Sequence, residues 1–180
     1  MRIETEELII RNFEPADEED LCEYMMQRVH AEFEAYPHFT PDKAKQEVAF
    51  RSKSDEFFAI ELKGAHKVIG NVYLGKRRFN ARELGYVLHE DYQNRGYGRA
   101  ASKAIIDFAF MQGVHRIYAE CAPQNVSSWK VMERVGMKRE AHFRENVSFH
   151  FDDQGNPIYW DTYVYAVLNP NRGGEQREGS

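Results

Sequence analysis

The apolar residues in the first half of the chain alternate between helical spacing and short continuous runs. Helices are predicted to start at Pro15–Asp17, with apolar positions continuing to Val29, and at Thr40–Asp42, where the helix continues to Arg51. The turn at residues 63–66 predicts a hairpin, and therefore a meander of antiparallel strands. These strands are predicted over four apolar runs, at residues 8–13, 57–62, 68–74 and 82–88.

The second half of the chain adds one parallel connection. An apolar face at helical spacing runs from Tyr97 to Met111 and ends at Gly113, and the strand 116–122 follows. A strand–helix–strand order places this strand parallel to residues 82–88, and at such a crossover a sheet can splay and admit a ligand. The remaining predicted elements are one helix and two strands, at residues 125–136, 137–144 and 159–168.

These elements predict a fold of the α/β (α+β) class. Its centre is a mixed, mostly antiparallel sheet of about six to seven strands, with a splayed parallel pair and flanking helices. The chain has 180 residues, 42% of them apolar, which is enough for one sizeable core. We expect a single domain over residues 1–168 and a polar, flexible C-terminal tail over residues 169–180.

Composition and charge exclude several classes of function. The net charge is −5 and the pI about 5.8, so no global basic field attracts nucleic acid. The N-terminus is too polar for a signal peptide, and no run of ~18 apolar residues predicts a membrane span. Cys22, Cys121 and the seven histidines show no metal-ligand spacing. We expect a cytoplasmic protein with reduced cysteines, no metal, and no direct contact with nucleic acid or membrane.

The most informative segment is the glycine turn, residues 93–100, which lies between a predicted strand and a predicted helix. The free N–H groups of a first helical turn point at one site and attract an anion. Gly96 and Gly98 let a bulky group approach the backbone, and Arg95 and Arg99 can hold phosphates. The segment therefore predicts a phosphate site, with the simpler alternative that the two glycines only shape a tight turn.

Two other phosphate motifs fit the glycine turn poorly. The chain contains no G-x-x-x-x-G-K-[ST] sequence, which argues against a Walker-type nucleotide site. The dinucleotide fingerprint G-x-G-x-x-G has its third glycine where Ala101 stands. That fingerprint also opens its strand–helix–strand unit, whereas several predicted strands precede the turn here.

Together with segments on both sides, the glycine turn resembles the GCN5-related N-acetyltransferases. The family loop Q/R-x-x-G-x-G/A is matched from Gln93 to Gly98. The opening residues 3–11 and the closing residues 160–165 are similar to the branch that modifies ribosomal-protein N-termini. Residues 83–88 are similar to the strand that precedes the loop in the family. Residues 125–128 are similar to the N-x-x-S start of a later helix, and residues 133–137 to the end of that helix.

The resemblance implies acetyl-coenzyme A as the acetyl donor. Val87 and Leu88 would offer backbone groups to the pantetheine arm, in the manner of an added strand, and Asn125 would hydrogen-bond the same arm. The thioester would lie in the gap between residues 82–88 and residues 116–122. The pyrophosphate would be bound by the family loop, with Gln93 as part of the motif and N–H groups from Arg95, Gly96, Tyr97, Gly98, Arg99 and Ala100.

Acetyl transfer to an amine needs a base, an oxyanion donor and help for the leaving thiolate. The N–H of Val87 or Leu88 is the expected oxyanion donor. Many relatives place a tyrosine seven residues after the asparagine, but Met132 stands there. Ser128 is therefore the candidate that contacts the departing sulfur, unless it only caps the helix. The candidate bases are Glu120, Glu83 and Glu145. Some relatives have a glutamate at the position of Glu120, where it acts as a base through a water.

The sequence thus predicts transfer of an acetyl group from acetyl-coenzyme A to an amine by direct attack in a ternary complex. The acceptor would be a protein N-terminus or a small amine. The alternative is an acyl-coenzyme A-binding sensor without turnover, which Met132 favours and which Ser128 and Glu120 oppose. Residues 146–151 alternate in β fashion and carry aromatic side chains. They line an acceptor groove, pair with a second subunit in a homodimer, or form an ordinary hairpin arm.

Overall fold

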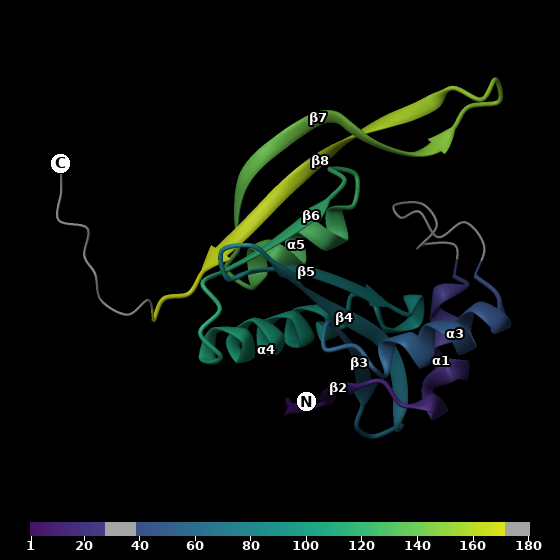
Figure 1. Ribbon diagram of the computed structural model, residues 1–180, viewed down its shortest axis with the longest axis vertical. Coiled ribbons are helices and arrows are strands. Elements are labelled where there is room, and N and C mark those ends of the chain that lie inside the picture. The colour runs from purple at the N-terminus through teal and green to yellow at the C-terminus, as the bar shows by residue number, and fades with distance from the viewer. Residues whose placement is uncertain (28–38, 172–180) are drawn as a thin grey trace.

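The centre of the computed structural model, which describes residues 1–27 and 39–171, is one eight-stranded sheet (Figure 1). Neighbouring strands are antiparallel except β5 and β6, which are parallel. This confirms the predicted α+β class, and the short β1 is the strand that the apolar runs did not predict. The strand order β1-β2-β3-β4-β5-β6-β8-β7 joins β1 (Arg2–Glu4), β2 (Leu8–Asn12), β3 (Phe57–Leu62), β4 (Lys67–Arg77), β5 (Ala81–Leu88), β6 (Arg116–Cys121), β8 (Pro157–Leu168) and β7 (Lys138–Phe151).

Helices cover both faces of the sheet because its central strands bury alternate residues on opposite sides. Along β3, Phe58 and Ile60 belong to the core that includes Ile105 of α4, whereas Ala59 belongs to the core that includes Leu21 of α1. Val29, which we predicted on the first helix, lies outside the described residues. The described helices are α1 (Glu18–Met25), α3 (Pro41–Arg51), α4 (Tyr97–Met111) and α5 (Val126–Arg134).

Helix α4 follows its predicted apolar face, with one exception. Ala101, Ile105 and Ala109 are buried against the sheet, but Met111, in the last turn, is 75% exposed. Gly113 has a φ of 81° and stands just beyond the helix, as expected of a residue that ends it. The packed face holds the first turn of α4 in place, and the glycine turn lies directly before that turn.

The parallel pair β5 and β6 diverges along its length, as predicted. The two strands pair only from Ala81 with Arg116 to Glu83 with Tyr118. Beyond that point β5 continues to Leu88 along β4, and β6 continues along β8. The facing edges of β5 and β6 are therefore unpaired over the last residues of each strand, and a gap opens between them.

The C-terminal part of the fold is more extensive than predicted. Strand β7 extends through residues 146–151, so this segment is one arm of a long hairpin with β8 whose tip projects from the sheet (Figure 1). Asn169, which we placed in the predicted tail, is 5% exposed, and its side-chain amide donates to the carbonyl oxygens of Val114 and Phe110. Residues 172–180 lie outside the described part.

Two expected absences can be examined only within residues 1–27 and 39–171. In these ranges no helix is both long enough and apolar enough to cross a membrane. The same ranges contain no group of three or more histidine, cysteine, aspartate or glutamate side chains that could hold a metal ion. His30 and His38 are outside these ranges.

Candidate functional site

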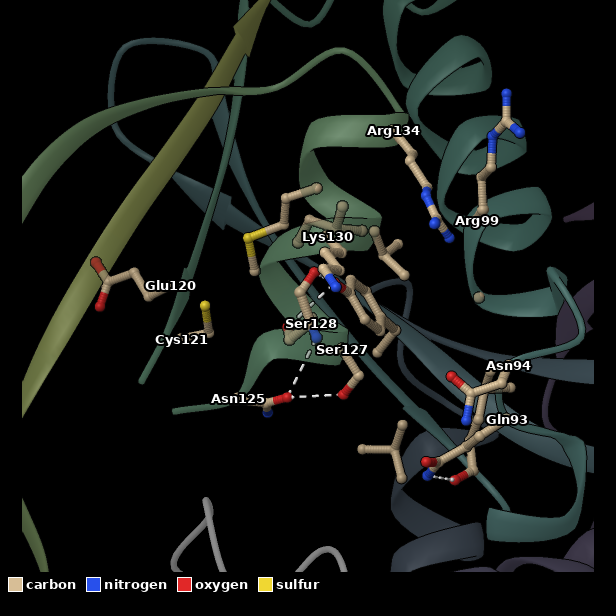
Figure 2. Close-up of a pocket in the computed structure, with 18 of the residues that line it drawn as sticks. Gln93, Asn94, Arg99, Glu120, Cys121, Asn125, Ser127, Ser128, Lys130 and Arg134 are labelled. Carbon is tan, nitrogen blue, oxygen red and sulfur yellow. Dashed lines mark hydrogen bonds between the residues drawn. The ribbon is translucent and has the colours of Figure 1, made fainter. Parts of the chain in front are cut away.

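The gap between β5 and β6 opens into a cavity of about 600 Å³, within the size range of small-molecule sites. One wall is the free end of β5, and another is the end of β6 with the loop that follows it. The first turn of α4 and one face of α5 close the remaining sides (Figure 2). The predicted site residues that line the cavity are Val87, Leu88, Gln93, Gly96, Gly98, Arg99, Glu120, Asn125 and Ser128.

Glu145, which is described with the candidate bases below, and four other predicted site residues do not line the cavity. Each of these four has a local reason. The guanidinium of Arg95 lies over the ring of Tyr92, 5.6 Å from its centroid, and Tyr97 also packs beside Tyr92. The N–H of Ala100 donates to the carbonyl of Gly96 at 2.9 Å, so it is the first bond of α4 and is not free for a ligand. The remaining residue, Glu83, is held by a cation, as described below.

The glycine turn leaves a set of free backbone donors at the start of α4. Gly96 is the N-cap and has a left-handed φ of 90°, which places α4 directly after the turn. Because the first helical bond is made by Ala100, the N–H groups from Gly96 to Arg99 have no partner within the helix. A Cβ added at Gly96 would meet nothing within 4 Å, so the space beside the N-cap is open.

Gly98 is needed for packing rather than for its backbone angles. A Cβ added there would lie 3.3 Å from Leu88 Cδ1 and 3.8 Å from Val131 Cγ2. The missing side chain therefore lets the start of α4 approach both β5 and α5. Gln93 has a related role, since its amide donates to the Leu88 carbonyl at 3.1 Å and ties the turn to the end of β5.

Two cations on α5 were missed at the sequence level. Ser127, Lys130, Val131 and Arg134 line the cavity, and their spacing of three and four residues puts them on one face of α5. Figure 2 shows Arg134 extending from α5 toward the start of α4, where Arg99 stands. The periodic pattern was visible in the sequence, but only the placement of α5 beside the cavity shows which face matters.

Asn125 forms the start of α5. Its Oδ1 accepts the N–H of Ser128 at 3.2 Å and the hydroxyl of Ser127 at 3.0 Å (Figure 2). Asn125, and not Ser128, is therefore the N-cap of α5. Because the oxygen of the amide is engaged in these two bonds, Nδ2 is the group of the Asn125 side chain that remains as a donor.

Ser128 meets a phenol that sequence reasoning missed. The hydroxyl of Tyr86, from β5, lies 2.7 Å from the Ser128 carbonyl oxygen and 3.1 Å from Ser128 Oγ. Burial raises the pKa of Tyr86 above its usual value, and it raises the pKa of Cys121 to about 11. Both groups line the cavity and keep their protons near neutral pH. Met132 also borders the cavity, but it is 2% exposed and packs in the core.

The three candidate bases have different surroundings. Glu120 is exposed at the cavity, yet desolvation by its neighbours and the charge of Glu83 raise its pKa, against a smaller opposing effect of Arg77. Figure 2 shows its carboxylate on the opposite side of β6 from Cys121. Glu83 is ion-paired with Arg77, which also donates to Tyr118. Glu145 lies on β7, outside the cavity lining.

Comparisons with known proteins agree on one family. The profile of the acetyltransferase (GNAT) domain matches residues 7–138. The uncharacterized N-acetyltransferase YnaD of Bacillus subtilis is 34% identical over 175 residues, which cover 93% of this chain and 97% of YnaD. The crystal structure of a GNAT-family acetyltransferase from Bacillus anthracis superposes with a TM-score of 0.85 at 32% identity, covering 94% of this chain and 99% of that one.

A further solved structure is similar over nearly the same length. The ribosomal-protein-S5-alanine acetyltransferase from Vibrio fischeri has a TM-score of 0.76 at 27% identity, covering 95% of this chain and 98% of that one.

Proposed function

The chain belongs to the acetyltransferase (GNAT) family of acetyl-coenzyme A-dependent N-acetyltransferases, and we propose that it transfers the acetyl group by direct attack of an amine on a thioester held in the cavity between β5 and β6. The observation that carries this proposal is the cavity itself. Free N–H groups at the start of α4, an unpaired strand edge on β5 and a carboxylate on β6 all border one space.

The charges around the cavity suit the phosphates of coenzyme A. The whole chain carries a net charge of −5, yet Arg99, Lys130 and Arg134 line the cavity and Glu120 is its one lining carboxylate within the described residues. We place the pyrophosphate at the N–H groups of Gly96–Arg99 and the pantetheine arm along the free edge of β5. Two proteins with this fold, MccE and RimL, were solved with acetyl-coenzyme A and coenzyme A.

Three groups are proposed to act on the reacting atoms. Glu120 accepts the proton of the amine through a water, because only the neutral amine has a lone pair for attack. The N–H of Leu88, on the edge of β5 that faces away from β4, donates to the oxyanion as the tetrahedral intermediate forms. When the C–S bond breaks and sulfur takes its electron pair, the Ser128 hydroxyl donates a hydrogen bond to the thiolate. The raised pKa of Glu120 brings this carboxylate closer to a base that works near neutral pH.

The proposed acceptor is an amine of a protein N-terminus or a small molecule. The relative from Vibrio fischeri is named for acetylating an alanine of ribosomal protein S5, which supports the first class. The test is release of free coenzyme A from acetyl-coenzyme A against a panel of ribosomal-protein N-terminal peptides, polyamines and aminoglycosides. Turnover with one class identifies the acceptor. Tight binding of acetyl-coenzyme A without turnover on any amine would instead indicate a sensor module.

We expect Arg134→Ala to weaken binding of acetyl-coenzyme A, because Arg134 is proposed to contact the 3′-phosphate of the ligand. The cations of α5 line the same cavity as the proposed pyrophosphate donors of α4, and we propose that they meet the adenosine end of the ligand. Loss of one charge-assisted contact predicts a roughly three- to tenfold higher Kd. Acetyl-dephospho-coenzyme A, which lacks that phosphate, should bind the wild type and the variant equally. Arg78→Ala, outside the cavity lining, is the control, and an equal loss for both ligands in Arg134→Ala would contradict the assignment.

A further inference from the structure

A hydroxyl from strand β5 reaches the first turn of α5 beside the cavity. The ring of Tyr86 packs against the core, and its oxygen lies 2.7 Å from the carbonyl oxygen of Ser128 and 3.1 Å from Ser128 Oγ. The N–H of Ser128 is held separately by Asn125. Ser128 is thus fixed through its N–H, its carbonyl and its hydroxyl, by residues from two different segments.

The number of protons on these groups determines which one donates. A carbonyl only accepts, so the phenol proton of Tyr86 goes to the Ser128 carbonyl. A phenol has one proton, and the 3.1 Å contact must therefore use the Ser128 hydroxyl as donor and the Tyr86 oxygen as acceptor. Rotation about the Cβ–Oγ bond of Ser128 then redirects its proton from Tyr86 to the cavity. No heavy atom has to move in that rotation.

We propose that Tyr86 is a positioning residue, which holds Ser128 so that its hydroxyl proton turns to the coenzyme A sulfur as the thiolate leaves. This inference rests on the proposed acetyl transfer and adds a residue that the family resemblance did not supply. A thiolate attracts the proton more strongly than the neutral phenol oxygen does, because hydrogen bonds to charged acceptors are the stronger ones. Many relatives have a tyrosine on α5 at the position of Met132, and in this chain the phenol near the site comes instead from Tyr86 on β5.

The surroundings of Ser128 require no proton transfer from Tyr86. Burial raises the pKa of Tyr86, so the phenol stays neutral while the thiolate forms. Cys121, whose thiol is within hydrogen-bonding reach of Ser128, also stays protonated. In the step, the C–S bond breaks, sulfur keeps the electron pair, and the proton lost by the amine goes to Glu120. Ser128 contributes a hydrogen bond and is unchanged at the end.

The test uses the ionisation of the coenzyme A thiol on the full-length protein, which needs no acceptor. The pKa of bound coenzyme A is followed by the ultraviolet absorbance of its thiolate, with desulfo-coenzyme A as the reference ligand. We expect Tyr86→Phe to raise this pKa by about one unit relative to wild type, as Ser128→Ala does. The double variant should match Ser128→Ala alone, because Tyr86 acts through Ser128. Tyr165→Phe, which removes a phenol bonded to Glu133 on another part of α5, should leave it unchanged.

Kinetics with an accepted amine should show the same pattern. Tyr86→Phe is expected to lower kcat about tenfold with an unchanged KM for acetyl-coenzyme A, the size of one aligned hydrogen bond in the transition state. An unchanged thiol pKa in Tyr86→Phe, or additive effects of the two substitutions, would overturn the positioning role while leaving the donor site intact. A wild-type protein that does not bind coenzyme A would overturn the proposed function as well.

Discussion

Gly96→Asp is expected to abolish binding of acetyl-coenzyme A. The new carboxylate would stand among the free N–H groups of α4, where the pyrophosphate is proposed to lie, and two unit charges ~4 Å apart repel by about 4 kcal/mol near a protein surface. That corresponds to a loss of affinity of at least about a hundredfold. The fold should survive, because a Cβ at Gly96 meets no atom within 4 Å and the only backbone strain is the left-handed φ of 90°.

A matched variant separates charge from backbone strain. Gly96→Asn adds a side chain of nearly the same size, tolerates the left-handed conformation and carries no charge. Calorimetric titration should therefore show a much smaller loss for Gly96→Asn than for Gly96→Asp, at similar melting temperatures. Retained affinity in Gly96→Asp would remove the glycine turn from the donor site.

Glu120→Gln is expected to lower kcat by about a hundredfold or more at neutral pH, the usual contribution of a general base. The affinity for acetyl-coenzyme A should change little, because the carboxylate lies away from the proposed phosphate sites. In the wild type, activity requires the ionised form of Glu120. Desolvation and Glu83 raise the pKa of Glu120. As the pH is lowered, activity should therefore be lost at a higher pH than it would be with an ordinary glutamate as the base. A full rate in Glu120→Gln would exclude this base.

Glu83→Gln tests the role of Glu120 through the direction in which the pKa of Glu120 should move. The substitution removes the negative charge of Glu83, which raises the pKa of Glu120. It also releases Arg77 from its ion pair, and the charge of Arg77 lowers the pKa of Glu120. Both effects act in one direction, so the acidic limb of the pH–rate profile should move to lower pH with a similar maximal rate. A profile that does not move would show that Glu120 does not govern the limb.

The sequence predicted well the parts of the site that one continuous segment builds. The left-handed Gly96 and the helix that starts at Tyr97 follow from local turn chemistry and an apolar face. The start of α5 at Asn125 follows from an amide at the N-cap. The divergence of β5 and β6 follows from a single parallel crossover in an antiparallel sheet.

Individual side-chain contacts could not be predicted in the same way, whether the two residues are near or far apart in the sequence. Glu83 was a reasonable candidate base until the neighbouring strand β4 placed Arg77 against it. Tyr86 meets Ser128 across 42 residues of sequence, and no local pattern signals that contact. Arg95 stands beside the glycines in the sequence, but its side chain turns to Tyr92, while the cations that border the cavity include Arg134 from α5.

The most direct test of the donor site is amide hydrogen exchange on the wild-type protein with and without acetyl-coenzyme A. Bound ligand should slow exchange at three places that border the cavity: the free end of β5 from Leu84 to Leu88, the start of α4 at Gly96–Arg99, and the first turn of α5. Protection at all three places is the predicted result. Binding that leaves these segments exchanging as before, or that protects a different surface, would contradict the proposed donor site.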